Sequence, residues 1–339
     1  MEKIYFRPII QTDALRPKDA RTLAGGWGWF SRLEVLTRAG ARGEIAASDL
    51  PAPVAARLTD ARAPLAGIGF DCPRIMGILN VTPDSFSDGG RHETPQAALA
   101  RALEMAQAGA DIVDIGGEST RPGAADVAAH DEVARTAPVI AALRTGGFDR
   151  PISIDTRKAS VARAALEAGA DLVNDVSALG YDRDMAALLA AKGAPVCLMH
   201  AQGTPQTMQA APHYDNVLLD VYDYLEARLA LAEAAGIARD RVLVDPGIGF
   251  GKTQAHNLTL LRGLSLFHGL GAVLLLGVSR KRFIGTIGGA EAAEARGPGT
   301  LALTLAGVAQ GVQVHRVHDV AEVAQGLRLW RAVTMEEWV

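Results

Sequence analysis

Hydrophobic residues from position 73 onward form short runs rich in Ile, Val and Leu, and these alternate with Ala-rich stretches of helical period. The apolar runs cover residues 75–79, 111–115, 151–154, 172–173 with their neighbours, 194–199, 241–244, 272–278 and 312–317. The helical stretches that follow them cover residues 95–108, 125–144, 158–168, 183–191, 216–235, 254–264, 298–310 and 320–333. Eight strands, each followed by a helix, predict an α/β fold of the (β/α)8 TIM-barrel type, with a doubly wound parallel sheet as the alternative.

The ends of three predicted helices share one signal. Gly109, Gly169 and Gly236 each follow an Ala-rich turn and precede a small or apolar residue that leads to the next strand. A glycine at this position adopts the left-handed conformation that ends a helix. The three glycines therefore support the helix boundaries.

Residues 1–70 have a different pattern. They contain extended pieces at residues 5–11 and 33–37, a GGWGWF run at residues 25–30 and a possible helix at residues 53–62. No group of residues with catalytic potential is found among them. We predict an N-terminal extension, residues 1–70, that packs on the bottom or the side of a barrel domain formed by residues 71–339.

Polar residues follow every predicted strand. In TIM barrels the groups that bind and convert substrates lie at the carboxyl ends of the strands. The polar segments at these ends are Asn80, residues 116–123 (GGESTRPG), 155–157 (DTR), 174–177 (NDVS), His200, 245–252 (DPGIGFGK), 279–281 (SRK) and 316–319 (RVHD). Their recurrence around the whole barrel predicts an enzyme.

The first polar segment is unusually long. Residues 80–90 read NVTPDSFSDGG, directly after the apolar residues 75–79. So many turn-forming residues exceed what a connection needs, which predicts a mobile segment that closes over a ligand. An ordinary surface loop is the alternative.

Composition narrows the class of protein. The 339 residues are 49% hydrophobic, enough for a large core, and a net charge of −4 leaves no basic surface for a nucleic acid. Two cysteines are too few for a disulfide framework. No signal-peptide pattern and no apolar run of ~18 residues is seen. We expect a cytoplasmic protein without a membrane or nucleic-acid partner.

One group of polar residues suits a heterocycle. Asp155, Asn174, Asp245 and Lys281 follow four different strands and should converge at the barrel centre. Carboxylates accept hydrogen bonds from amino and ring N–H groups, whereas we expect Asn and Lys to supply donors. A single Asp after a strand is more often a helix cap, but repetition around one ring weakens that explanation.

A second group suits an anion. Arg316 and His318 are two residues apart on an extended run, so both should point to one side, away from His315. With Asn80 and the Thr120-Arg121 pair on nearby strand ends, they predict a site for phosphate oxygens and for Mg²⁺ that keeps most of its waters.

Other motifs fail. Residues 246–253 would form a nucleotide-binding phosphate loop only if position 246 were Gly, and it is Pro246. His315 and His318 are wrongly spaced for a zinc pair, and Cys72 and Cys197 lack a Cys-x-x-Cys setting. No Ser-His-Asp or Cys-His arrangement is recognisable.

Seven segments together carry a family resemblance. They are residues 80–90 (NVTPDSFSDGG), 116–123 (GGESTRPG), 153–156 (SIDT), 174–177 (NDVS), 245–252 (DPGIGFGK), 279–281 (SRK) and 316–320 (RVHDV). In this order they resemble dihydropteroate synthase over residues 73–335. The resemblance implies a homodimeric transferase of folate biosynthesis and a target of sulfonamides. It would join 6-hydroxymethyl-7,8-dihydropterin pyrophosphate to 4-aminobenzoate, with release of pyrophosphate and formation of 7,8-dihydropteroate.

The resemblance also implies residue roles. The implied pterin pocket consists of Asp155, Asn174, Asp245, Lys281 and Met199. The implied pyrophosphate site consists of Asn80, Arg316 and His318, with Asn80 as the Mg²⁺ ligand. The implied aminobenzoate elements are Thr120 and Arg121 on the second loop and Pro83, Phe86 and Ser87 on the first. Arg282 either binds the aminobenzoate carboxylate or faces solvent.

The implied mechanism is dissociative. Pyrophosphate leaves first, and the aryl amine traps a pterin methylene cation; Asp155, Lys281, Arg121 and Thr120 are the implied catalytic residues. Two alternatives are a pterin-binding domain of a corrinoid-dependent methyltransferase and a pterin-binding paralogue without turnover. The first should lack residues 80–90 and the Arg316/His318 pair, and the second should have lost site residues that are all present here.

Overall fold

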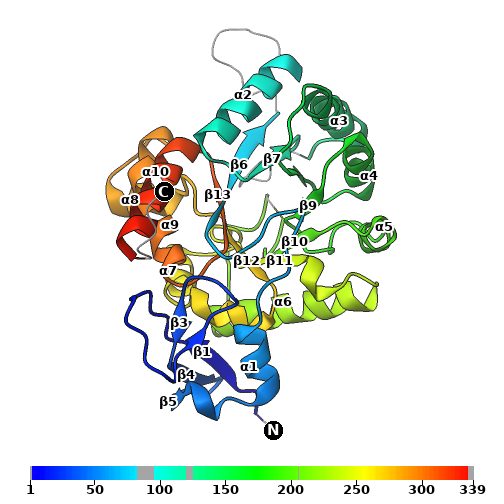
Figure 1. Ribbon diagram of the computed structural model, residues 1–339. Helices are drawn as coiled ribbons and strands as arrows, with labels where there is room; N and C mark the ends of the chain where they lie inside the picture. The colour runs from blue at the N-terminus through cyan, green and yellow to red at the C-terminus, as the bar shows by residue number, and fades with distance from the viewer. Residues whose placement is uncertain (1, 82–94, 120–123, 125, 205, 335–339) are drawn as a thin grey trace.

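Eight parallel strands close into a barrel in the computed structural model, which describes residues 2–81, 95–119, 124, 126–204 and 206–334 (Figure 1). The strands are β6 (Arg74–Asn80), β7 (Ile112–Gly116), β8 (Ile152–Asp155), β9 (Leu172–Asp175), β10 (Val196–Met199), β11 (Val242–Asp245), β12 (Val273–Leu276) and β13 (Val314–Val317). The pairing of β9 with β10 and of β13 with β6 closes the ring. The predicted TIM barrel is confirmed, and the doubly wound sheet is excluded.

Helices connect successive strands and surround the barrel (Figure 1). They are α2 (Pro95–Ala108), α3 (Ala129–Thr145), α4 (Ala159–Ala168), α5 (Met185–Lys192), α6 (Val217–Ala234), α7 (Gln254–Arg262), α8 (Arg282–Gly288), α9 (Gly297–Val308) and α10 (Val320–Thr334). Short 3-10 turns are η2 (Arg239–Arg241), η3 (Leu264–Leu270) and η4 (Glu294–Arg296). The predicted helices are all present, whereas α8 and η3 were not anticipated.

Two local details test the sequence reasoning. Gly109, Gly169 and Gly236 have φ values of 116°, 112° and 94°, so all three adopt the expected left-handed conformation. Helix α3 begins at Ala129, four residues later than expected, because Val127 is held by side chains: its N–H donates to Glu118 Oε1 and its carbonyl accepts from Lys158 Nζ. Tertiary contacts therefore override helical propensity here.

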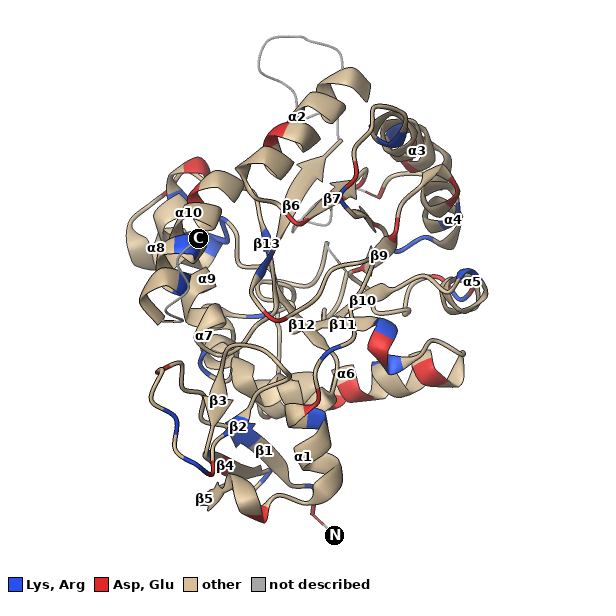
Figure 2. Ribbon diagram, in the orientation of Figure 1, with Lys and Arg blue, Asp and Glu red and all other residues tan. Residues whose placement is uncertain are grey.

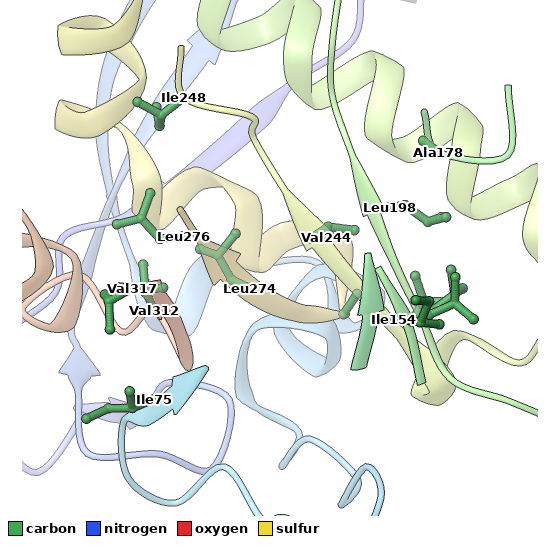
Figure 3. Close-up of a cluster of buried hydrophobic side chains, with 14 of the residues drawn as sticks. Ile75, Ile154, Ala178, Leu198, Val244, Ile248, Leu274, Leu276, Val312 and Val317 are labelled. Carbon is green, nitrogen blue, oxygen red and sulfur yellow. The ribbon is translucent and has the colours of Figure 1, made fainter. Parts of the chain in front are cut away.

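Side chains along each strand point alternately to the outside and the inside of the barrel, and this separates two hydrophobic layers. One set of strand residues packs outward against the helices, including Ile75, Ile154, Val244 and Leu276 (Figure 3). The other set fills the barrel interior and consists of Met76, Ile112, Leu172, Cys197, Leu243, Val273, Leu275 and Val314. Successive side chains of a strand point to opposite faces, which explains the division.

The interior cluster is closed from below by the segment that precedes β6. Leu65 and Phe70 are buried in this cluster and Ile68 packs against it, next to residues at the amino ends of the strands. Leu65 and Ile68 exchange two backbone hydrogen bonds, which hold the segment in a tight turn. Apolar side chains thus fill the lower barrel, and only the carboxyl ends of the strands are left for polar chemistry.

Residues near the amino terminus form small sheets with their own core. The first sheet pairs β1 (Tyr5–Pro8) with β4 (Arg32–Thr37) and β5 (Gly40–Ala46), and β2 (Arg21–Thr22) pairs with β3 (Trp29–Phe30). The turn η1 (Ala47–Asp49) and helix α1 (Ala52–Thr59) follow. Strand β5 was not anticipated because five of its seven residues are exposed, so it has little apolar alternation.

Contacts join this part of the chain to the side of the barrel. Trp27 Nε1 donates to the Val308 carbonyl at 2.9 Å, and the Tyr5 ring meets Tyr222 of α6 edge-on. Lys3 and Arg38 pair with acidic residues of α6, a helix on which Figure 2 shows both signs of charge. The division of the chain into two domains at residue 70 stays a prediction.

Replacing Trp27 by alanine should destabilise the whole protein. Its side chain is 5% exposed and packs in the same cluster as the barrel helices. We expect the free energy of unfolding to fall by about 3–5 kcal/mol, measured by urea denaturation. Leu15→Ala is the control, since Leu15 is 88% exposed and its loss should change the value by about 0.5 kcal/mol or less. Equal effects of the two variants would contradict a structural contact between Trp27 and the barrel.

Within the part of the chain that the structure describes, no helix is both long and apolar enough to cross a membrane.

Candidate active site

Inside the barrel, a layer of polar side chains follows the apolar layer in the direction of the carboxyl ends of the strands. Side chains two positions apart on a strand point to the same side, so each interior residue is followed by another interior residue two places later. The pairs are Ile112 and Asp114, Leu172 and Asn174, Cys197 and Met199, Leu243 and Asp245, and Val314 and Arg316. This layer places most of the sequence-predicted pterin residues together near the carboxyl ends of the strands.

The centre of the site is a guanidinium between two carboxylates. Arg316 Nε donates to Asp114 Oδ2 at 2.6 Å, and its Nη2 donates to Asp155 Oδ2 at 2.7 Å. Asp114 Oδ2 also accepts from Asn174 Nδ2 at 3.1 Å. The sequence predicts Arg316 in the anion group and Asp155 in the heterocycle group, whereas the structure joins them in one ion pair.

Burial controls the protonation of this centre. Loss of solvent raises the pKa of Asp155 to about 7, which Arg316 opposes and the neighbouring Asp114 reinforces. Burial also disfavours charge on Arg316, but Asp114 and Asp155 outweigh it and raise the guanidinium pKa. The oxygens Asp114 Oδ1, Asp155 Oδ1 and Ser153 Oγ are buried without a hydrogen-bond partner among the described residues. A ligand with N–H groups would satisfy such acceptors.

Asp245 and Lys281 lie on the opposite arc of the ring. Asp245 Oδ1 accepts from the Gly247 N–H at 2.7 Å; burial raises its pKa, and this N–H and Lys281 oppose the rise. Lys281 Nζ lies 4.1 Å from the centre of the Phe250 ring. A Cβ at position 249, where φ is +85°, would come within 3.2 Å of Lys281 Cδ, so a glycine leaves room for this lysine.

The loop that carries Phe250 is held by a buried lysine. Lys252 Nζ lies 2.8 Å from His200 Nδ1, 2.8 Å from the Gly247 carbonyl and 3.0 Å from the Phe250 carbonyl. Burial lowers the pKa of Lys252 well below its usual value and that of His200 to about 2. Because the amine is bound to the loop's own backbone, it cannot serve as the lysine of a phosphate loop, in agreement with the rejection of that motif.

The residues of the predicted anion site lie along the rim. Asn80, Gly116 and Asp155 are register neighbours at the ends of β6, β7 and β8. A Cβ at position 116 would lie 3.4 Å from Asn80 Oδ1 and 3.7 Å from Asp155 Cβ, so Gly116 leaves a gap between these two side chains. His318 Nδ1 lies 2.9 Å from Ser279 Oγ, which fixes the imidazole at the end of β13.

The remaining predicted residues divide into two sets. Met199 is buried beside Gly247, and Arg282 is an exposed residue at the start of α8. Five predicted residues lie outside the described residues: Pro83, Phe86, Ser87, Thr120 and Arg121.

Sequence reasoning missed several residues of the site. Asp114 was counted only as part of an apolar strand, although a carboxylate in the middle of such a run is itself a signal, because charged residues are rarely buried unless they are paired. Phe250 and Lys252 lay within a quoted segment but received no role. Phe250 meets Lys281 and Lys252 meets His200 between strand ends that are distant in the sequence, and no local pattern reports such contacts.

Asp155 leads to a prediction about pH. Its pKa is about 7 in the folded protein and 3.8 in an unfolded chain, so the folded state holds the proton more tightly. The stabilisation from this proton is complete below pH 3.8 and is lost as the pH rises through about 7. Urea unfolding should therefore show the wild-type protein losing stability relative to Asp155→Asn over this range, and a constant difference would contradict it.

Three comparisons with known proteins agree. Residues 76–318 match a family model described as pterin binding enzyme. The dihydropteroate synthase of Neisseria meningitidis serogroup C is 48% identical over 269 residues, 78% of this chain and 94% of that protein. A structure of Xanthomonas albilineans dihydropteroate synthase with 4-aminobenzoic acid has a TM-score of 0.74 and 47% identity, and covers 79% of this chain and 96% of that one. The Yersinia pestis enzyme in a sulfonamide drug complex has a TM-score of 0.74 and 44% identity, with 78% and 96% covered.

Proposed function

The chain belongs to the dihydropteroate synthase family, and on this premise we propose how its barrel joins a pterin to 4-aminobenzoate. The enzyme is a transferase of folate biosynthesis. It condenses 6-hydroxymethyl-7,8-dihydropterin pyrophosphate with 4-aminobenzoate, and the products are 7,8-dihydropteroate and pyrophosphate. The roles of individual residues in this reaction are proposals.

The pterin pocket is proposed at the polar layer of the barrel interior. The observation that carries this proposal is the pair of buried acceptor oxygens Asp155 Oδ1 and Ser153 Oγ, which have no partner among the described residues. The amino and ring N–H groups of a pterin supply the missing donors. Asp245 adds a further carboxylate, Lys281 supplies a donor for a carbonyl oxygen, and Met199 provides an apolar wall; with Asn174 these make up the proposed pocket.

The reaction is proposed to proceed by departure of pyrophosphate before the amine attacks. The bond from the pterin methylene carbon to oxygen breaks with its electron pair going to pyrophosphate, which leaves a cation delocalised into the reduced ring. The ionised form of Asp155, next to Arg316, stabilises that cation. The amine nitrogen then forms the new bond and loses a proton to solvent. No nucleophile or general base is required.

Stabilisation of the leaving pyrophosphate is assigned to Arg316, His318 and Asn80. Asn80 also fits a Mg²⁺ ion, because its amide oxygen is a hard donor at the rim beside the gap left by Gly116. The described residues hold no cluster of three or more His, Cys, Asp or Glu side chains around a metal position. The donor set thus suits an ion that keeps most of its waters. When bound, Mg²⁺ would neutralise charge on the pyrophosphate oxygens.

The aminobenzoate side remains assigned by resemblance. Thr120 and Arg121 on the second loop, and Pro83, Phe86 and Ser87 on the first, are proposed to shape this pocket and take part in closing it. Arg282 is exposed at the start of α8, and its guanidinium is proposed to pair with the aminobenzoate carboxylate. We propose that sulfonamides compete with 4-aminobenzoate for this pocket, as the Yersinia pestis complex suggests.

A homodimer in the cytoplasm is proposed for the assembled enzyme. Leu329 and Val333, four residues apart on α10, are 64% and 82% exposed, and a second copy of the chain would cover such an apolar strip. Cys72 and Cys197 form no disulfide, in keeping with a reducing compartment. Light scattering should give twice the mass of one chain, and a single-chain mass would refute the dimer.

The function is tested by following both products. Purified protein is given the dihydropterin pyrophosphate, Mg²⁺ and 4-aminobenzoate, with a control that lacks the amine, and pyrophosphate and dihydropteroate are measured in parallel. Equal amounts of the two products confirm the synthase. Tight pterin binding without either product would instead indicate the paralogue without turnover. Addition of a sulfonamide to this assay should raise the apparent KM for 4-aminobenzoate and leave kcat unchanged, because the two compounds are proposed to compete for one pocket.

A further inference from the structure

Asp114 is a fully buried carboxylate beneath the proposed pterin pocket. It lies on β7, two residues before Gly116, and its exposed fraction is 0%. Its Oδ2 accepts two hydrogen bonds, from Arg316 Nε and from Asn174 Nδ2, while its Oδ1 has no partner among the described residues. Asp114 therefore touches a residue from each of two distant strands, β9 and β13.

A carboxylate at this place settles which way the Asn174 amide faces. An asparagine side chain presents an oxygen on one side and an NH₂ group on the other, and an ionised carboxylate can only accept hydrogen bonds. With the amide oxygen toward Asp114, two acceptors would oppose each other in a buried site, which is costly. The NH₂ group must face Asp114, so the oxygen faces away from it.

The same carboxylate orients Arg316. The guanidinium donates through Nε to Asp114 and through Nη2 to Asp155, and two anchors fix a planar group more firmly than one. Asp155, the residue proposed to stabilise the cation, is thereby held by a guanidinium that is itself held by Asp114. Removal of the Asp114 carboxylate would free the side chains of Arg316 and Asn174 at the same time.

We propose that Asp114 is a positioning residue for the pterin pocket: by fixing the Asn174 amide and the Arg316 guanidinium, it makes Asn174 present an acceptor oxygen to an N–H group of the pterin. This inference rests on the proposed function, because it assumes that a pterin occupies the polar layer. It reverses the expectation that Asn174 supplies a donor, and it selects heterocycles with an N–H at the edge nearest β9.

The central test is Asp114→Asn, which keeps the size of the side chain and removes its charge. An amide at position 114 can donate or accept, so the orientation of Asn174 is no longer enforced. We expect the Kd for 6-hydroxymethylpterin, measured by calorimetry, to rise about tenfold or more, while the KM for 4-aminobenzoate changes by about twofold or less. An unchanged pterin Kd would overturn the proposal.

A double-mutant cycle separates positioning from a general structural effect. In an Asn174→Ala background the amide is gone, so Asp114→Asn should raise the pterin Kd by only about threefold. Equal losses in both backgrounds would show that Asp114 does not act through Asn174. If Asp114→Asn does not fold, Asp114→Glu, which displaces the carboxylate by one methylene, is expected to give the same pattern.

Asp175→Asn is the matched control. Asp175 is also a buried carboxylate at a strand end, but it bonds to Ser177 and to the Leu179 N–H rather than to pocket residues. Its loss should lower the Tm and leave the pterin Kd unchanged; an equal rise in Kd would refute the specific role of Asp114. If the wild-type enzyme makes no dihydropteroate, the proposed function fails. If the wild type turns over and Asp114→Asn binds pterin normally, only this inference fails.

Discussion

Replacing Arg316 by methionine should abolish turnover and strongly destabilise the enzyme. Methionine fills much of the same volume, but it leaves Asp114 and Asp155 without their shared cation in the barrel interior. Breaking a buried ion pair by removing one partner costs about 3–5 kcal/mol. The variant also lacks the positive charge that stabilises the leaving pyrophosphate and pairs with Asp155. We therefore expect kcat/KM to fall by about 10³-fold or more.

The pH dependence of this variant distinguishes the ion pair from simple packing. Without Arg316 the protonated form of Asp155 is favoured, and a protonated carboxyl needs no cation. Arg316 lowers the pKa of Asp155 to about 7, so this pKa lies higher in Arg316→Met. The difference in unfolding free energy between wild type and variant should therefore shrink as the pH falls toward about 7 from above, and stay constant below about 7. A difference that does not vary with pH would indicate lost packing instead. Urea denaturation at several pH values measures it.

A matched control is available at the other end of the molecule. Arg7 pairs with Glu34 at 2.7 Å, but both side chains are 28% exposed and lie far from the strand ends of the barrel. Arg7→Met removes an arginine ion pair of similar length, and it should change the unfolding free energy by about 1 kcal/mol or less and leave kcat/KM unchanged. The carboxylate partners of Arg316 are 0% and 9% exposed, so similar losses in both variants would mean that burial of the carboxylates has no special weight.

Replacing Lys281 by alanine should weaken pterin binding strongly while the fold survives. The lysine is half-buried, its charge lowers the pKa of Asp245, and its Nζ lies over the Phe250 ring. It therefore offers a charged hydrogen-bond donor at the rim of the barrel and contributes little to the hydrophobic core. A hydrogen bond from a charged group is worth about 1.5–3 kcal/mol, so the Kd for a pterin should rise by about 10–100-fold. The cation–π contact with Phe250 should contribute about 0.5–1 kcal/mol to the loss of stability.

Calorimetry with 6-hydroxymethylpterin and thermal denaturation measure the two effects of Lys281→Ala. Lys192→Ala is the control, since Lys192 is an exposed lysine on α5 paired with Glu167 at 3.3 Å. An unchanged Kd in Lys281→Ala would remove this residue from the pocket. Lys281→Arg keeps the charge but alters its shape, so recovery of binding in that variant would show that charge alone is needed.

Local sequence patterns were sufficient for the barrel itself. Apolar runs and Ala-rich helical periods located the eight strands and the helices after them, because secondary structure depends on side-chain periodicity within a few residues. Glycine at helix ends was read correctly for the same reason: Gly109 must adopt a positive φ wherever the helix packs. Strand β5 and helix α8 carry weaker periodicity and were missed.

The candidate site was predicted as a set of strand ends, and this part needed only the fold class. Asp155, Asn174 and Asp245 were expected to converge because all strands of a parallel barrel end at one face, and the structure brings them together in the polar layer. The individual roles carried over from the family resemblance stay predictions until the variants are measured.

The sequence by itself determined which residues stand at the carboxyl ends of eight strands, since periodicity and turn residues are local properties. Only the tertiary structure decided that Arg316 bridges Asp114 and Asp155, that Asn174 turns its NH₂ group toward Asp114, and that Lys252 meets His200. These contacts join residues up to 202 positions apart. They depend on strand register and on the depth of each side chain in the barrel, and both are set by closure of the whole ring rather than by any segment of it.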